Sequence, residues 1–158
     1  MASPVRAKLF AVFLLLVAGC ALSPRGDDVN LAQVSTQQVV ARLALYEDSM
    51  RRMDYDQSAD MFTESGEVSS VGAAAVQGRE AIRKFLKSFA AFRILAYSTL
   101  ADSTAVDGIS ATQLGVYSQT VIVPAGDTIH VHGRFEALWS HQPNGDWQLH
   151  RMHTIPIK

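Results

Sequence analysis

The period of the apolar residues changes near Phe92, and this change constrains the fold more than any other feature of the sequence. Beyond that point β-branched and aromatic residues alternate with polar ones, which is typical of strands with one buried face. The breaks VDG, PAGD and PNGD are each short enough to join antiparallel neighbours. This half of the chain therefore predicts four strands, at Arg93–Asp102, Ile109–Val123, Thr128–His141 and Trp147–Ile157.

The residues before Phe92 show helical spacing instead. Ser35 and Asp54 are each followed three residues later by Gln, and these capping boxes predict two helix starts. A third helix is expected after Gly78, and a brief strand around Val68. The residues expected to point inward are Val39, Leu43, Tyr46, Met50 and Met53, then Tyr55, Ala59 and Phe62, then Ile82, Phe85, Leu86 and Phe89. Three helices followed by a strand meander predict one α+β domain.

The N-terminus has the features of a targeting segment. Arg6 and Lys8 precede the uncharged run LFAVFLLLVAG, which is shorter than the roughly 20 residues that span a bilayer and has the length of a signal-peptide core. The run ends in VAGC, where Cys20 is the sole cysteine of the chain. This resembles the lipobox of bacterial lipoproteins, which implies cleavage before Cys20 and acylation with chains such as palmitate. The alternative is a Sec signal cleaved near VAG with an incidental cysteine.

The lipoprotein resemblance implies a division of the chain. Residues 1–19 form the signal peptide, residues 20–34 the lipidated cysteine and a flexible polar tether, and residues 35–158 the folded domain. We expect an exported protein held at a bacterial membrane by acyl chains on Cys20. Because Ala21 rather than Asp follows the cysteine, the resemblance implies the periplasmic side of the outer membrane if the source is Gram-negative.

Charge and motifs exclude several partners and cofactors. The formal net charge of the 158 residues is −1, and Lys and Arg form no block. A nucleic-acid partner is therefore not expected, since it would require a basic face. The sequence also has no phosphate loop, no dinucleotide fingerprint and no Gly-x-Ser-x-Gly motif, and no cofactor is expected.

The strand expected at Thr128–His141 has two faces of different character, because side chains alternate along a strand. One face is predicted to lie on the core and consists of Ile129, Val131, Gly133, Phe135, Ala137 and Trp139. The other face is predicted to meet solvent or a second subunit and consists of His130, His132, Arg134, Glu136 and Leu138. Pairing of this second face with its own copy would give a homodimer.

Three segments together resemble the nuclear transport factor 2-like superfamily, in its SnoaL-like and ketosteroid-isomerase-like branch. They are RRMDYDQSADMFTESGEV, GREAIRKF and the terminal RFEALW with NGDWQLHRMH, in that order and spacing. The resemblance covers residues 35–158. It implies a curved antiparallel sheet wrapped around three helices, forming a cone with one central pocket.

The same resemblance bears on catalysis. Ketosteroid isomerases use a carboxylate base, a tyrosine and a protonated carboxylic acid. Tyr46 falls at the position of the tyrosine, although a core aromatic is the alternative for it. The base position falls on Ser70, and the second acid would lie near the apolar Phe135. Because a serine hydroxyl is no base near neutral pH, ketosteroid isomerisation is not expected.

His150 is the remaining catalytic candidate. Alternation places it opposite Trp147 and Leu149, outside the cone, unless a bulge changes the face. Inside the cone its imidazole would be a base or hydrogen-bond donor near neutral pH.

His130 and His132 share one strand face, and His150 or His153 on the next strand is a candidate further ligand for zinc. Zinc requires three or four convergent ligands, and the lipobox resemblance implies that lipidation consumes Cys20. No metal is expected.

We therefore expect a membrane-anchored lipoprotein whose cone binds a small apolar or amphipathic molecule. An enzyme of the isomerase, dehydratase or cyclase kind that uses Tyr46 and His150 is the second hypothesis, and a dimeric interaction module without a ligand is the third. The expected lining residues are Tyr46, Phe62, Phe85, Phe135, Trp139 and Met152.

Overall fold

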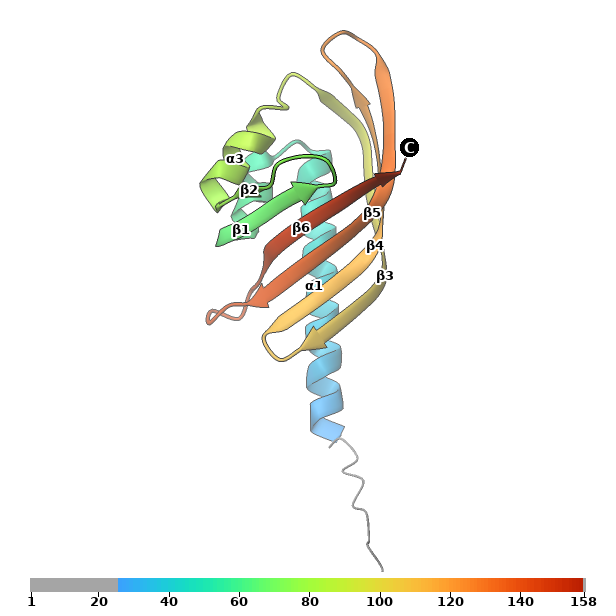
Figure 1. The fold of residues 1–158 in the computed structure, drawn as a ribbon. Helices are drawn as coiled ribbons and strands as arrows, with labels where there is room; N and C mark the ends of the chain where they lie inside the picture. The colour runs from blue at the N-terminus through green and yellow to red at the C-terminus, as the bar shows by residue number, and fades with distance from the viewer. Residues whose placement is uncertain (1–25, 158) are drawn as a thin grey trace, which may run out of the picture.

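The structure, a computed structural model, describes the backbone of residues 26–157 and the side chains of residues 33–157. In this range three helices pack against one face of a curved six-stranded sheet, as predicted for an α+β domain (Figure 1). The elements are α1 (Gly26–Arg51), α2 (Tyr55–Asp60), β1 (Phe62–Ser70), β2 (Val76–Gln77), α3 (Arg79–Lys87), β3 (Arg93–Asp107), β4 (Ser110–Ile122), β5 (Thr128–His141) and β6 (Trp147–Ile157). No helix within residues 26–157 combines the length and apolarity needed to cross a membrane. The expected signal peptide and Cys20 lie outside the described residues.

Helix α1 starts earlier than the sequence predicted. It begins at Gly26, so the expected tether is helical from that residue onward, and Ser35 lies inside the helix. The residues between Gly26 and Ser35 include neither Gly nor Pro, and nothing in them terminates a helix.

The junction between α1 and α2 follows the predicted second capping box. The Asp54 carboxylate accepts a hydrogen bond from the Gln57 backbone N–H at 3.1 Å. Met53 has φ of 57°, a left-handed conformation that ends the apolar stripe of α1. Met53 was expected to continue that stripe, and it lies in the turn instead.

The six strands form one sheet in the order β2-β1-β6-β5-β4-β3. Strands β3 to β6 are antiparallel neighbours, which confirms the meander predicted from the short breaks. β1 joins β6 in parallel, and β2 pairs with β1. β3 extends beyond its predicted end at Asp102, because a register shift between Ala101 and Ser103 interrupts the alternation there.

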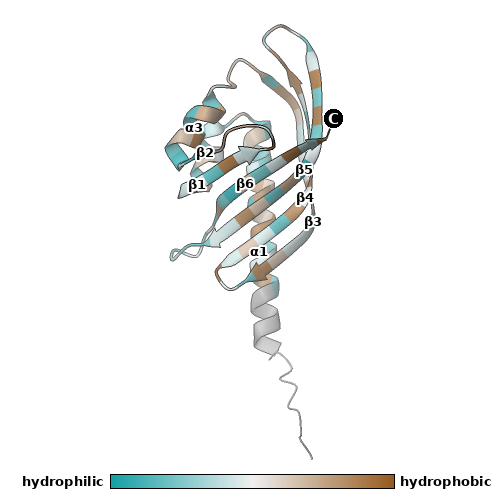
Figure 2. Ribbon diagram, viewed as in Figure 1, coloured by the Kyte–Doolittle hydropathy of each residue, from teal (hydrophilic) through white to brown (hydrophobic). Residues whose placement is uncertain are grey.

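From Gly133 onward the two faces of β5 have the predicted character, whereas Ile129, predicted on the core face, is exposed. Alternating hydrophilic and hydrophobic residues are visible along the strands in Figure 2. Gly133, Phe135, Ala137 and Trp139 are buried on the inner face. On the outer face His130, His132 and Arg134 are exposed, and Glu136 and Leu138 are half-buried.

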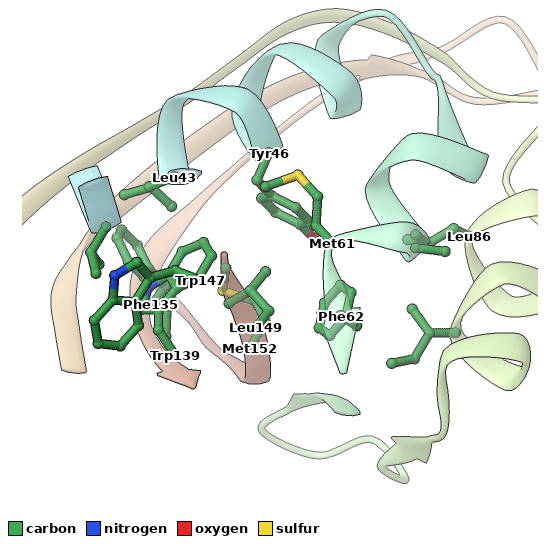
Figure 3. Packing of buried hydrophobic residues seen from close by; sticks show 14 of the residues in the cluster. Leu43, Tyr46, Met61, Phe62, Leu86, Phe135, Trp139, Trp147, Leu149 and Met152 are labelled. Atoms are coloured by element: carbon green, nitrogen blue, oxygen red, sulfur yellow. The ribbon is translucent and has the colours of Figure 1, made fainter. Parts of the chain in front are cut away.

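Figure 3 shows part of the hydrophobic core, in which Phe135, Trp139 and Trp147 lie close together. The two tryptophans are at the β5–β6 end of this core. Trp139 is 1% exposed, and its Nε1 donates to Gln113 Oε1 at 2.8 Å. Trp147 Nε1 donates to Gln38 Oε1 on α1 at 3.3 Å. Both rings are therefore buried without an unsatisfied indole donor.

Candidate functional site

A cavity of about 390 Å³ lies between α3 and the sheet. Figure 1 shows that α3 covers one end of the sheet. The walls of the cavity come from the C-terminal part of α1, the first residue of α2, β1, β2 and the turn between them, α3 and the segment after it, and the inner face of β3 to β6. Ligand pockets in proteins usually occupy about 300–1,000 Å³, so this cavity suits a small molecule.

Three phenylalanines on and after α3 form one wall. The rings of Phe85 and Phe89 meet edge to face with centroids 5.1 Å apart, and those of Phe89 and Phe92 do so at 5.5 Å. Such contacts contribute about 0.5–1.5 kcal/mol each beyond area burial, and they hold the wall in shape. Phe89 is 37% exposed, so it forms part of the boundary between cavity and solvent.

All four tyrosines of the chain line the cavity. Tyr46 comes from α1, Tyr55 from α2, Tyr97 from β3 and Tyr117 from β4. Burial raises the pKa of each of these phenols above its ordinary value near 10. At neutral pH the four side chains are therefore uncharged hydrogen-bonding groups.

Tyr97 has an acidic neighbour behind the wall. Burial is the main cause of its raised pKa, and Tyr46, Glu47 and Tyr117 add to the shift. The Glu47 carboxylate accepts hydrogen bonds from Thr99 N at 2.9 Å and from Thr99 Oγ1 at 2.8 Å, which fixes it on the α1–β3 side of the cavity.

The described residues that line the cavity include no Asp, Glu, His, Lys or Arg. Its remaining polar side chains are Ser70, Gln119 and Thr154. Ser69 also borders the cavity, but its hydroxyl lies 2.9 Å from His153 Nδ1. Ser70 thus lies in the cavity wall, and its hydroxyl does not supply a base near neutral pH. The cavity can orient a ligand through neutral hydrogen bonds, while its lining provides no carboxylate or imidazole to move a proton.

Three of the six predicted lining residues, Tyr46, Phe85 and Met152, line the cavity. The prediction is wrong for Phe62, which is fully buried beneath Tyr46, with the two rings in edge contact at 6.1 Å.

It is also wrong for Phe135 and Trp139, which lie on the predicted face but at the filled end of the sheet. On the same face of β5, Ile129 and Val131 line the cavity instead. Alternation defines the face of a strand and not the position along it, so it could not separate these two groups.

His150 is exposed and is not among the residues that line the cavity. Strand β6 has a bulge at His150. Trp139 on β5 pairs with Leu149, and the preceding Leu138 pairs with Arg151, so one residue of β6 has no partner. The extra residue is His150, which stays outside, and the bulge directs Met152 inward. Tyr46 and His150 are therefore not brought together.

The sequence prediction missed most of the aromatic lining, including Tyr55, Phe92, Tyr97 and Tyr117. Helical spacing predicted that Tyr55 points inward, but Tyr55 was not among the predicted lining residues. Tyr97 and Tyr117 belong to predicted strands, and aromatic residues at alternating positions were the signal that could have identified them.

The outer sheet face contains no converging metal ligands. His130 Nδ1 lies 3.0 Å from Thr120 Oγ1, and His153 Nδ1 lies 2.9 Å from Ser69 Oγ. Within the described part of the chain, no three His, Cys, Asp or Glu side chains are close enough to hold a metal ion.

The same face combines ion pairs with exposed apolar side chains. Arg134 contacts Asp102 at 3.0 Å, and Arg151 pairs with Glu136. Leu100, Val116 and Ile155 are exposed around Arg134, in register on neighbouring strands.

The model of the SnoaL-like domain family matches residues 31–153. No curated protein matches the chain.

Solved structures share the fold. A ketosteroid isomerase-like protein from Erwinia carotovora atroseptica SCRI1043 superposes with a TM-score of 0.72 and 17% identity, covering 78% of this chain and 97% of that chain. A protein of unknown function from Mycobacterium tuberculosis gives 0.73 and 22%, covering 87% and 78%. A nuclear transport factor 2-like superfamily protein from Salmonella enterica serovar Typhimurium LT2 gives 0.68 and 16%, covering 80% and 93%. At these identities the likeness concerns the fold alone.

Proposed function

We propose that this chain, which belongs to the SnoaL-like domain family, binds a small apolar or amphipathic molecule in the cavity between α3 and the sheet. The observation that carries the proposal is the contrast within one interior. Near the β5–β6 turn the space under the sheet is filled by residues such as Trp139 and Trp147. Near α3 the interior contains the cavity, which is lined by aromatic side chains and neutral polar groups.

The proposal is tested by titrating the protein with N-phenyl-1-naphthylamine, an uncharged dye that fluoresces in apolar surroundings. A Val131→Trp variant places a large ring in the cavity, and a His132→Trp variant places the same ring on the outer face of the same strand. We expect saturable dye binding to the wild type and to His132→Trp. The Val131→Trp variant should lose dye binding, while its circular dichroism spectrum shows that the fold is retained. Equal binding by both variants would contradict the proposal.

Catalysis by Tyr46 and His150, as an isomerase, dehydratase or cyclase, receives no support from their positions, because His150 is exposed. The absence of ketosteroid isomerisation remains a prediction. It rests on Ser70 in the cavity wall and on a lining without carboxylates among the described residues. Conversion of a 5-ene-3-ketosteroid above the buffer rate would refute it.

Lipid anchoring through Cys20 is proposed from the sequence alone, on VAGC and the single thiol. With it we propose export to a bacterial membrane, on the periplasmic side of the outer membrane in a Gram-negative source. Cell fractionation of a Cys20→Ala variant tests both points. The lipoprotein hypothesis would be contradicted if the Cys20→Ala variant stays in the membrane fraction and the wild-type N-terminus is unmodified.

A homodimer through the outer sheet face is also proposed. Leu100, Val116 and Ile155 are exposed there beside the Arg134–Asp102 pair, which is a mixed surface that can pair with its own copy. Sedimentation at increasing protein concentration provides the test, and a monomer throughout would remove the proposal.

A further inference from the structure

The side chains that line the cavity share a property that bears on the choice of ligand. None of the described lining residues is an Asp, Glu, His, Lys or Arg, and their hydrogen-bonding side chains are phenols, hydroxyls and one amide. The four phenols remain protonated near neutral pH because burial raises the pKa of each.

This lack of charge does not reflect a lack of charged residues in the surrounding helices. On α3, Arg83 pairs with Asp56 at 3.0 Å and Asp60 at 2.6 Å, and Lys87 pairs with Asp56 at 2.7 Å. These groups lie on the outer side of α2 and α3, whereas Phe85 of the same helix lines the cavity.

One charged group near the wall, the Glu47 carboxylate, is negative. Glu47 is held by Thr99 and contributes to the raised pKa of Tyr97. An anion in the cavity would therefore find no lining cation to offset its desolvation, and it would be repelled by this carboxylate.

We infer that the cavity selects uncharged molecules and excludes anionic derivatives of the same shape. This inference rests on the proposed function and adds to it the charge state of the ligand. The ligand class is an apolar ring or chain compound that carries a neutral carbonyl, hydroxyl or amide. The Gln119 amide and the tyrosine hydroxyls donate to and accept from such groups.

Two dyes with the same ring system test the inference. N-Phenyl-1-naphthylamine is neutral, and its 8-sulfonate adds one negative charge. Each is titrated at one ionic strength, and binding counts as cavity binding where Val131→Trp abolishes it. We expect the neutral dye to bind in the cavity at least about tenfold more tightly than the sulfonate, because an unpaired charge is costly to desolvate. Equal affinities, or tighter binding of the sulfonate there, would overturn the inference and leave the proposed function standing. If neither dye occupies the cavity, the proposed function fails as well.

A matched pair of lysine variants tests the cause. Gln119 lies on the inner face of β4 between Tyr97 and Val131, and Ser118 is exposed on the outer face of the same strand. Gln119→Lys should tighten cavity binding of the sulfonate about tenfold through a charge-assisted contact, whereas Ser118→Lys should leave it unchanged. An equal effect of both variants would show that the charge acts from outside the cavity, and it would overturn the inference.

Discussion

Gly133 lies directly across the β4–β5 ladder from Tyr117, and the missing side chain leaves the space that the tyrosine ring occupies. A Cβ on residue 133 would lie 2.9 Å from Tyr117 Cε1 and 2.3 Å from the Ile155 carbonyl oxygen on β6. Neither approach is tolerated in a close-packed interior. The glycine thus sets both the orientation of a cavity tyrosine and the spacing of two strands.

The Gly133→Ala variant should consequently lose both stability and ligand binding. We expect a loss of about 1–3 kcal/mol in the free energy of unfolding, the usual range for overpacking, together with weaker binding of the neutral dye. Chemical denaturation and dye titration measure the two effects.

Gly126→Ala is the control for this variant. Gly126 has φ of +94° in the β4–β5 turn, and a Cβ there meets nothing within 4 Å. It should cost stability through backbone strain but leave dye affinity unchanged. Equal loss of affinity in both variants would show that general destabilisation, and not the position of Tyr117, governs binding.

Trp139→Ala and Phe89→Ala should separate stability from binding. Trp139 is buried at the filled end and donates to Gln113, so its removal should cost about 3–5 kcal/mol of stability. Phe89 is 37% exposed and lines the cavity, so its removal should mainly weaken dye binding. The reverse outcome, with affinity lost in the folded Trp139 variant and retained in the Phe89 variant, would place the binding site elsewhere.

Tyr46→Phe removes one hydroxyl from the cavity wall. For a ligand that accepts or donates a hydrogen bond there, we expect affinity to fall by about 0.5–1.5 kcal/mol while the fold is retained. Calorimetric titration with a neutral ligand that carries a hydroxyl or carbonyl gives the value. If a reaction is found and this variant lowers turnover far more than affinity, Tyr46 acts in catalysis and not in simple binding.

The tyrosines also predict how stability depends on pH. Their pKa values are raised by burial, so below about pH 10 each phenol is protonated in the folded and unfolded chains alike and adds no pH dependence. Above about pH 10 the unfolded chain releases protons that the folded chain keeps, and stability should fall as pH rises. Urea unfolding at about pH 8 and about pH 10.5 tests this, and a Tyr97→Phe variant should show a smaller decline. Tyrosinate absorbance that appears in the folded protein at or below about pH 10 would contradict the raised pKa values of the tyrosines.

The fold could be predicted largely because its signals are local. The capping of α2 by Asp54, the short turns between strands and the two faces of β5 each follow from a few neighbouring residues. The parallel pairing of β1 with β6 could not be predicted in this way, because it joins segments far apart in the sequence and leaves no turn signal.

The candidate site could be predicted only in part for a related reason. Tyr46 and Phe85 were found because helical spacing places them inward, where the cavity lies. Phe135 and Trp139 were misplaced because the boundary between filled and hollow interior depends on how α1 and α3 meet the sheet. His150 was left undecided because the sequence does not show which residue of a bulge is extruded.

The most direct test of the binding site uses the methionine methyl groups as reporters. Met50 and Met152 line the cavity. Met61 lies in the core and Met53 packs against it, and neither residue lines the cavity. In protein labelled with ¹³C at the methionine methyls, addition of N-phenyl-1-naphthylamine should shift the Met50 and Met152 signals to saturation. The Met53 and Met61 signals should stay in place. Saturable dye binding that leaves Met50 and Met152 unmoved would contradict the account.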